Sequence, residues 1–411
     1  MKKTARIIVF TLVIILAAGG ILPAGQKVET VEGVRVVHNP AAGKWGKTPQ
    51  VTLQPVRTIG DVDTEDENFA FNQPSDLAVD AQGRLCVLDS GNHRVQVFSP
   101  DGKYIKTIGR QGQGPGEFFM PNSIDLDRNG NLYVSESNAA RIQAISPDGK
   151  IAKTVKLTEG GVGDTHVLNS GEFLMGGRGG GMRMMRLDLG GPAEKGAVPP
   201  LVKIFDPDGK QVREFGKGAD FGDFLVNNMA NETVTVVDAA DAVYLVFPFQ
   251  NRLEKYSYDG RLLWKADREL PYSMEIKSRG EMKREGQGGG TLNVSVRMPD
   301  LTRCATGSAV DGRGRLWVVT MARQLKENEK VRTSMMMSNT GGVVSGSQKT
   351  EGAVDLRKTD AYKLEVFDAE GVLLGSIPVS IFVDAIFIEG DRLFLIDRVR
   401  GVAIHEFKIE G

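Results

Sequence analysis

The stretch SGNHRVQVFSPDGK (Ser90–Lys103) returns 47 residues later as SNAARIQAISPDGK (Ser137–Lys150). Each copy holds an alternating apolar run that ends in the turn sequence PDGK. This turn occurs a third time at Pro207–Lys210, and degenerate copies stand at Tyr258–Arg261 and Ala369–Val372. A repeat of about 45–50 residues that contains only strand-like segments is typical of the blades of a β-propeller.

Each unit has the composition of four short strands. In the first unit, SDLAVD, RLCVLD, RVQVFS and KYIKTIG follow one another and are separated by AQG, SGNH and PDG. The second unit repeats this order as NSIDLD, NLYVSE, RIQAIS and KIAKTVKL. Such runs, rich in β-branched residues and closed by Gly, Asp and Asn, predict strands joined by tight hairpins. The sequence therefore predicts an all-β, six-bladed β-propeller built from four-stranded antiparallel blades.

The domain organisation follows from the positions of these units. The propeller is expected over residues 51–411, with blades at about 73–109, 120–157, 163–216, 226–267, 305–378 and 382–407. The last blade has only three strands before the chain ends. The segment LQPVRTI at 53–59 reads like a fourth strand without partners. Because an open ring would leave an exposed strand edge, we expect 53–59 to close the sixth blade beside 402–407.

The first residues look like an export signal. Lys2, Lys3 and Arg6 precede an apolar run at 7–18, which is the layout of a secretory signal peptide. Residues 1–25 are therefore expected to be a signal peptide or a retained N-terminal anchor, and residues 26–50 an arm that leads into the propeller. The chain is then exported, whether periplasmic, extracellular or anchored to a membrane and facing outside.

Composition limits the partners. The 411 residues carry a formal net charge of −1, so no electrostatic footprint for nucleic acid is present. Two cysteines, Cys86 and Cys304, are too few for a disulfide framework, and we expect one buried thiol and one semi-buried thiol. A monomer is expected, with membrane contact only through an uncleaved N-terminal segment.

The repeat also resembles a known family. The stretch DLAVDAQGRLCVLDSGNHRVQVFSPDGKYIKTIGRQGQGPGEFFMP at 76–121 is similar to an NHL repeat, with Asn92, His93, Arg94 and Val95 at the name-giving position. The resemblance is close over 73–157, looser over the other blades, and extends to exported bacterial propellers of this type. It implies six blades and no particular chemistry, because propellers serve both as binding modules and as enzymes.

The long connections all belong to one set. In a four-stranded meander the A–B and C–D turns lie on one face and the B–C and D–A connections on the other. We call the second face the long-loop face, because the long connections at 177–200, 267–303 and 322–360 all fall there. Long loops in a compact domain are usually either functional or disordered.

The long connections contain residues suited to binding. Methionine side chains are adaptable, and arginine binds anions and aromatic rings. The sequence therefore predicts recognition of a protein or peptide partner, with carbohydrate left open, and with local packing as the alternative role for the methionines. The candidate binding residues are Arg178, Met182, Arg183, Met184, Met185, Arg186, Met335, Met336 and Met337.

A second candidate site is the axial channel. Alignment of the innermost strands places Asp76, Ser123, Asp164 and Asp384 near its long-loop mouth. These residues suit either a bound cation or acceptance of backbone hydrogen bonds at strand ends.

Three arginines recur where the third strand of a blade begins. They are Arg94, Arg141 and Arg252. Because their recurrence is positional, we expect them to bridge or stack between blades, with anion binding as the alternative.

Catalysis has little support. The weak metal candidates are Asp76, Asp164, Asp384, His93 and His166. Two histidines fall short of the three that hold zinc in related amidating lyases acting on peptidyl hydroxyglycines, while the acids are the raw material of a lactonase-like site. No cofactor is predicted, calcium or zinc stays open, and no catalytic residue is assigned. A metal-dependent propeller enzyme is the alternative to a binding module.

Overall fold

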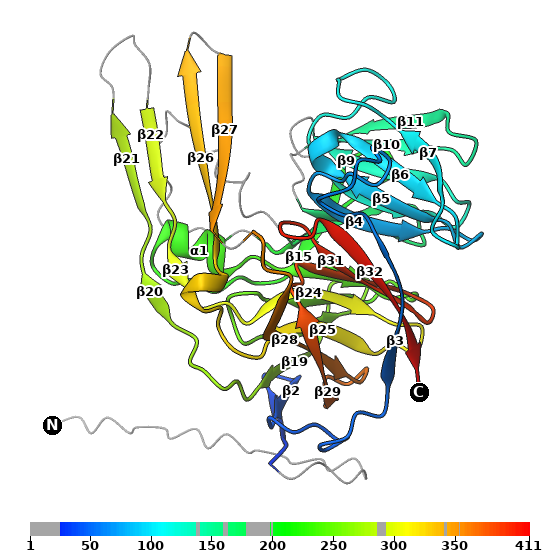
Figure 1. Cartoon of the computed structure of the whole chain (residues 1–411). Helices are drawn as coiled ribbons and strands as arrows, with labels where there is room; N and C mark the ends of the chain where they lie inside the picture. The colour runs from blue at the N-terminus through cyan, green and yellow to red at the C-terminus, as the bar shows by residue number, and fades with distance from the viewer. Residues whose placement is uncertain are drawn as a thin grey trace, which may run out of the picture.

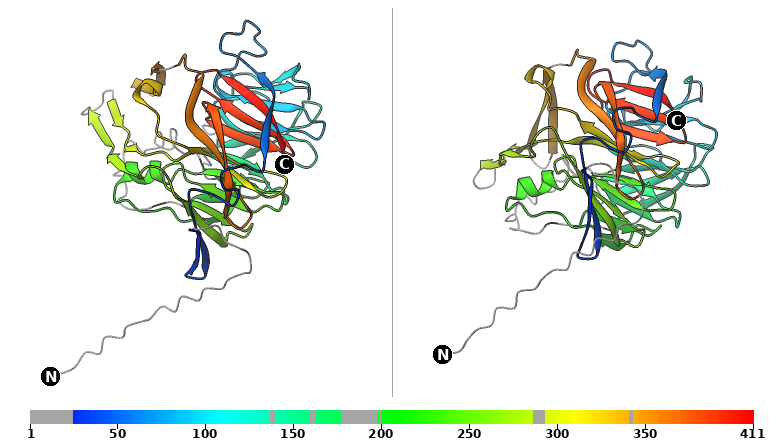
Figure 2. Two further views of the ribbon diagram at one scale, coloured as in Figure 1. Left: turned by 60° about the horizontal axis from the view of Figure 1, so that its bottom comes forward. Right: turned by 90° about the horizontal axis from the view of Figure 1, so that it is seen from below.

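The computed structural model is an all-β ring of six blades (Figures 1 and 2). It describes residues 25–136, 140–158, 163–177, 198, 200–285, 293–340, 343–352 and 354–411. In blades 1, 2, 3 and 5 the first strand along the chain is innermost, whereas blades 4 and 6 also contain N-terminal strands, which lie on their outer side. The predicted fold class is confirmed.

Blades 1 to 3 are four-stranded antiparallel sheets. Blade 1 holds β4 (Pro74–Val79), β5 (Leu85–Asp89), β6 (Arg94–Phe98) and β7 (Tyr104–Ile108). Blade 2 holds β8 (Pro121–Leu126), β9 (Leu132–Glu136), β10 (Arg141–Ile145) and β11 (Ile151–Lys156). Blade 3 holds β12 (Asp164–Val167), β13 (Phe173–Gly176), β14 (Val202–Phe205) and β15 (Gln211–Phe215).

The sheets of blades 4 and 6 include strands from the N-terminal part of the chain, whereas the sheet of blade 5 does not. Blade 4 holds β16 (Val234–Val237), β17 (Val243–Val246), β18 (Leu253–Tyr256) and β19 (Leu262–Arg268). Blade 5 holds β24 (Ala305–Val310), β25 (Leu316–Met321), β28 (Lys358–Phe367) and β29 (Leu373–Ile381). Blade 6 holds β30 (Ala385–Glu389), β31 (Arg392–Asp397), β32 (Ala403–Glu410) and β3 (Thr52–Ile59).

The ring is closed by strand β3. It pairs antiparallel with β32, with Leu53 opposite Ile409 and Ile59 opposite Ile404. Figure 1 shows this blue strand beside the red C-terminal strand. The predicted closure by an N-terminal strand is therefore confirmed, and one blade is shared by the two ends of the chain.

Blade 4 departs from the four-stranded pattern. The arm forms a hairpin of β1 (Lys27–Val31) and β2 (Val34–Asn39), and β2 pairs parallel with the outermost strand β19. The sheet thus has six strands. The arm then reaches blade 5, where Lys44 N and Trp45 N donate to the carbonyls of Leu373 and Leu374 at 3.1 and 2.6 Å.

Additional elements lie in the long connections. Helix α1 (Phe224–Ala230) precedes blade 4, where the sequence placed the start of that blade. Three antiparallel pairs are added between β19 and β28: β20 (Ile276–Ser278) with β23 (Asp300–Leu301), β21 (Glu281–Glu285) with β22 (Asn293–Arg297), and β26 (Val331–Thr340) with β27 (Val343–Gly352). Figures 1 and 2 show the last two pairs standing out from the ring.

The backbone conformation of the turns explains why their sequences recur. The glycine of each PDGK-type turn has a positive φ, from 79° at Gly371 to 89° at Gly209, a region that side chains with a Cβ rarely enter. In the A–B turns an aspartate closes the loop: one carboxylate oxygen of Asp80 accepts from the amides of Gln82 and Arg84 at 3.0 and 2.9 Å. Such Asx hydrogen bonds explain why the turn wording recurs.

The core lies between neighbouring blades. One apolar cluster packs Val95 and Val97 of blade 1 against Ile124 and Val134 of blade 2. Both cysteines are free and buried, so the expectation that one of the two thiols is semi-buried is wrong. Cys304 is 0% exposed, and its thiol donates to the carbonyls of Phe247 and Gln250. A search of the described part of the chain for a helix long and apolar enough to cross a bilayer returns none.

Candidate functional site

The axial channel is enclosed by the innermost strands of all six blades, namely β4, β8, β12, β16, β24 and β30. Its volume is about 460 Å³. Residues of A–B turns, among them Asn169, Asp241 and Gly390, line one end, so the channel extends to the face opposite the long-loop face.

Asp76 lies at the level of the channel that the sequence predicted. One carboxylate oxygen accepts from Ser123 Oγ at 2.7 Å and from the Ile124 amide at 2.9 Å, and the other accepts from the Leu77 amide at 2.9 Å. Burial, opposed by these hydrogen bonds and assisted by the charge of Asp164, raises the pKa of Asp76 to about 6. The carboxylate is thus already engaged by backbone and hydroxyl donors of blades 1 and 2.

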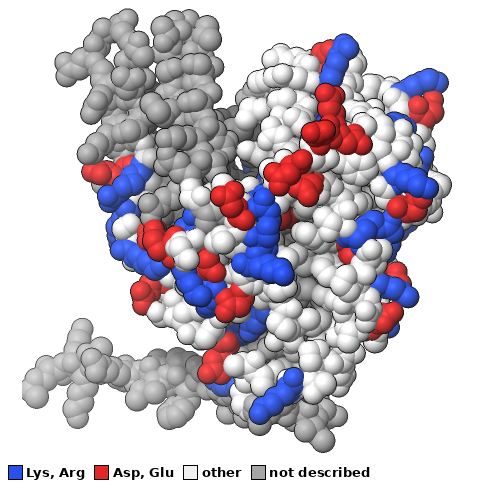
Figure 3. Space-filling model, in the orientation of Figure 1, with Lys and Arg blue, Asp and Glu red and all other residues white. Residues whose placement is uncertain are grey.

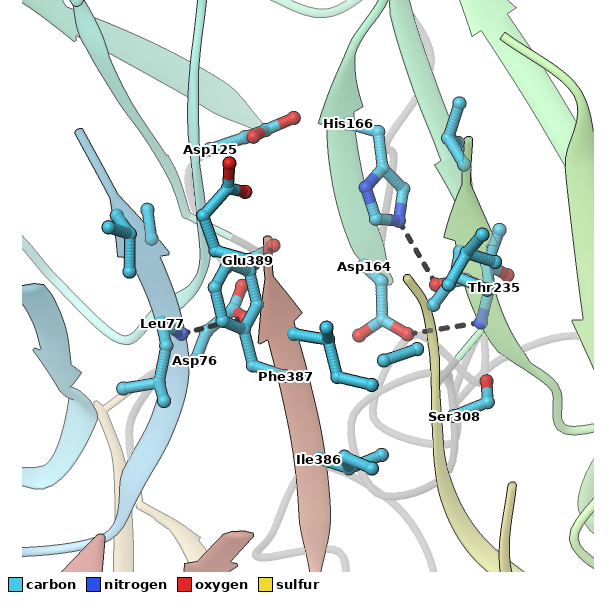
Figure 4. Close-up of a pocket in the computed structure, with 18 of the residues that line it drawn as sticks. Asp76, Leu77, Asp125, Asp164, His166, Thr235, Ser308, Ile386, Phe387 and Glu389 are labelled. Atoms are coloured by element: carbon cyan, nitrogen blue, oxygen red, sulfur yellow. Dashed lines mark hydrogen bonds between the residues drawn. The ribbon is translucent and has the colours of Figure 1, made fainter. Parts of the chain in front are cut away.

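The same connection recurs in the neighbouring blades (Figure 4). Asp125 of blade 2 accepts from the Val167 amide of blade 3 at 2.7 Å. In blade 3, Asp164 accepts weakly from the Thr235 amide of blade 4 at 3.5 Å, and His166 Nε2 lies 3.0 Å from the Thr235 carbonyl oxygen. The inner strands of blades 1, 2 and 3 are therefore each tied to the next inner strand by a polar side chain, which favours the structural one of the two roles expected for these acids.

Asp125 and Glu389 are two of the channel acids that the sequence analysis did not identify. Asp125 lies two residues after Ser123, hence on the same side of β8, and Glu389 ends β30. Burial raises the pKa of Asp125, and burial together with the charge of Asp125 raises the pKa of Glu389. Figure 4 shows the two carboxyl groups near one another. Two-residue periodicity from Ser123 was the signal that could have found Asp125.

A resident metal ion does not fit these residues. Asp384 is not among the residues that line the channel, and its carboxylate accepts from the Arg398 amide of its own blade at 2.8 Å. His93 lies in the B–C turn of blade 1, where Nδ1 accepts from the Met120 amide at 3.2 Å and the ring stacks on Phe119. Throughout the part of the chain that the structure describes, no three His, Cys, Asp or Glu side chains are grouped to hold an ion.

The recurring arginines join the third strand to buried acids and to the incoming connection. Arg141 donates from Nε to Glu136 at 2.7 Å and from its other nitrogens to the carbonyls of Gln113 and Glu117 at 2.6 and 3.0 Å. Arg94 pairs with the fully buried Asp89 at 2.9 Å and donates to the Ala70 carbonyl at 3.0 Å. These contacts give both side chains a structural role.

Arg252 repeats the arrangement in blade 4 with a change of partner. It pairs with Glu254 at 2.7 Å, donates to the Lys217 carbonyl at 2.8 Å and lies 4.3 Å above the Phe247 ring. Arg252 thus contacts both its own blade and, through Lys217, the connection that arrives from blade 3.

The predicted loop residues divide into two groups. Those at 178–186, namely Arg178, Met182, Arg183, Met184, Met185 and Arg186, lie outside the described residues. The structure places Met335, Met336 and Met337 on strand β26, which pairs residue by residue with β27. The second group therefore belongs to a regular hairpin, whereas the sequence suggested a long irregular loop.

Exposed apolar side chains gather on the long-loop face. Among the described residues eleven large apolar side chains are exposed, and seven of them lie in B–C or D–A connections or the elements within them. The other four lie on the arm or on outermost strands, and none lies in an A–B or C–D turn. The seven are Val62, Phe224, Ile276, Val296, Met298, Leu356 and Val399.

Comparisons with known proteins agree with the fold. A family described as 6-bladed beta-propeller matches residues 61–154. No curated protein matches the chain. A solved structure of a DUF4221 family member from Bacteroides vulgatus is similar, with 10% identity, a TM-score of 0.51, and coverage of 88% of this chain and 99% of that one.

Two further solved structures are more weakly similar. A putative exported protein from Bacteroides fragilis has 10% identity and a TM-score of 0.48, covering 91% of this chain and 99% of that chain. A gluconolactonase from Xanthomonas campestris has 14% identity and a TM-score of 0.46, covering 87% and 98%. With TM-scores below 0.5, neither likeness adds to the evidence for the fold or the function.

Proposed function

We propose that this chain is an exported propeller of the NHL type that binds a protein or peptide partner through its long-loop face. Export is supported by the charged and apolar segments at the N-terminus. The NHL assignment rests on the wording of the first two repeats, including Asn92-His93-Arg94-Val95.

The observation that carries the proposal is the placement of exposed apolar surface. Apolar patches at a soluble protein's surface mark sites of interaction. Here Phe224 on α1, Ile276 on β20 and Met298 after β22 are 37, 44 and 37% exposed. Their elements are in contact, since Arg279 lies 3.9 Å from Asp223 at the start of α1 and Ile276 is opposite Leu301 on β23.

The chemistry of this surface favours a polypeptide partner. Six of the seven exposed side chains are aliphatic or methionine, whereas sugar recognition relies on aromatic stacking combined with convergent polar groups. The charged side chains on the face in Figure 3 are of mixed sign, without the broad basic surface that a nucleic acid requires. The apolar character of these exposed side chains suits a protein or peptide.

The test is capture of a partner by matched variants. Wild-type chain, the variant Phe224→Ser with Met298→Ser, and the control Ile105→Ser with Val212→Ser are immobilised and exposed to envelope extract of the source cells. Ile105 and Val212 are 43 and 48% exposed but lie on outermost strands. We expect one partner, identified by mass spectrometry, whose affinity falls about tenfold or more in the first variant only. Equal capture by all three proteins, or none by wild type, would contradict the proposal.

A further inference from the structure

The outermost strands of the blades are protected against further pairing. Native sheets protect edges with charges, proline, bulges or covering segments. Strands β7, β11 and β15 each carry a charged residue and each shows a register shift against its neighbour. Strand β3 contains Pro55 and Arg57 and a shift between them.

The two remaining outer strands are covered. Strand β19 is paired along its outer side by β2. The edge of β29 is met by the arm, where Asn39 Oδ1 accepts from the Leu373 amide at 2.8 Å. The outermost strand of every blade therefore has a feature that hinders pairing with a further strand.

The pair β26–β27 has none of these devices over most of its length. Its ladder runs from Val331 opposite Gly352 to Thr340 opposite Val343, ten pairs without a register shift. Neither strand contains proline, and the charged residues Arg332, Lys349 and Glu351 all lie in the half nearer the ring. The outer half, Met335–Thr340 with Val343–Gln348, is uncharged.

The edge of this hairpin without a described partner strand is that of β27. Strand β26 has β27 on one side, and β22 of the neighbouring hairpin lies near its other side. Among the strands that the structure describes, β27 pairs with β26 alone. Its uncharged part, Val343–Gln348, offers about 20 Å of unpaired backbone donors and acceptors.

We propose that this edge of β27 takes up an extended, uncharged segment of the partner protein as an added strand. The inference rests on the proposed function and specifies how the partner is held. Main-chain hydrogen bonds supply the affinity in such strand addition, and side chains alternating along the added strand supply the specificity. A strand edge that nothing covers promotes aggregation through pairing with other chains. Because the six blade edges are protected and the edge of β27 is not, we infer that another segment covers β27.

The test uses a phage-displayed library of random peptides long enough to span β27, selected on the full chain. Counter-selection uses Ser345→Lys with Ser347→Lys, which introduces into β27 the charges found on the blade edges. The matched control is Val212→Lys on β15, an edge strand that is already charged. Thermal unfolding checks that the blades stay intact in both variants.

We expect enriched peptides of low charge that bind wild type and the control and bind the β27 variant at least about tenfold more weakly. Synthetic copies N-methylated at alternate residues should lose binding in one register only, because only one edge of an added strand faces β27. This readout requires no variant of the protein.

Two outcomes would overturn the inference. One is the absence of peptides that discriminate wild type from the β27 variant. The other is self-association of wild type, seen by light scattering and abolished in the β27 variant, which would make a second copy the occupant. In either case partner capture that depends on Phe224 and Met298 would leave the proposed function standing.

Discussion

At the scale of single residues, Arg141 shows what the repeated wording specifies. Its guanidinium neutralises Glu136, which is 1% exposed, and also closes the connection that arrives from blade 1. Breaking a buried ion pair by removing one partner leaves an uncompensated charge, which costs far more than losing an exposed pair. Arg94 and Arg252 do the same in blades 1 and 4, so the arginine recurs for a structural reason.

Replacing Arg141→Met should therefore lower the free energy of unfolding by about 3–5 kcal/mol. The matched control is Arg110→Met, since Arg110 also pairs with a glutamate, Glu117, but its side chain is 81% exposed. The control should lose less than about 1 kcal/mol. Denaturant titration measures both, and equal small losses would show that the recurring arginine has another purpose.

Asp76 gives stability a defined dependence on pH. Because its pKa is raised to about 6 in the folded chain, the folded state binds a proton that the unfolded chain releases near its ordinary pKa of 3.8. Between these values the folded state holds more protons, so this group's contribution to stability falls as pH rises from about 4 to about 6.

Comparison of wild type with Asp76→Asn isolates this contribution. Wild type should lose up to about 3 kcal/mol relative to the variant between pH 4 and pH 7, an upper limit because the channel admits solvent. The measurement is denaturant unfolding across that range. A constant difference between the two proteins would mean that the carboxyl group titrates normally.

At the scale of elements, local chemistry decided what could be predicted. The turns could be predicted from the sequence because their signals are local. Gly102 adopts a positive φ, and Asp80 accepts a hydrogen bond from the amide of Arg84 within its own turn. The closing strand at 53–59 was found because it repeats the pattern of β7. Both signals are contained within a few residues.

Elements fixed by distant contacts could not be read in this way. The sequence of Val34–Asn39 contains no signal that β2 pairs parallel with β19, because this pairing depends on how the arm crosses blade 4. The run TSMMMSNT lacks the alternation of polar and apolar residues that marks a strand, so the sequence predicts a loop where the structure has strand β26. Asp76 and Asp164 line the channel, but their hydrogen bonds to the next blade arise only when the ring is assembled, so the sequence could not reveal them.

At the scale of the whole molecule, the ring couples the two ends of the chain. Strand β3 supplies the outer strand of blade 6, and Ile59, 3% exposed, packs in the cluster that joins blade 6 to blade 1. The arm that precedes it covers blades 4 and 5. The arm covers blades that already have four strands, whereas β3 supplies the fourth strand of blade 6. Removal of the arm and removal of β3 should therefore have different consequences.

A chain beginning at residue 51 retains β3 and should unfold in one cooperative transition with a modestly lower midpoint. A chain beginning at residue 61 leaves β32 as a bare edge and opens the cluster around Ile404. It should lose several kcal/mol, because deletion of one buried isoleucine alone costs about 2–5 kcal/mol, and it should aggregate through the exposed edge. Calorimetry and light scattering compare the two chains, and a synthetic peptide of residues 51–60 should restore cooperative unfolding to the shorter one. If both chains unfolded alike, the ring would be held by blade packing alone, and the split blade would be a consequence of topology without a role in stability.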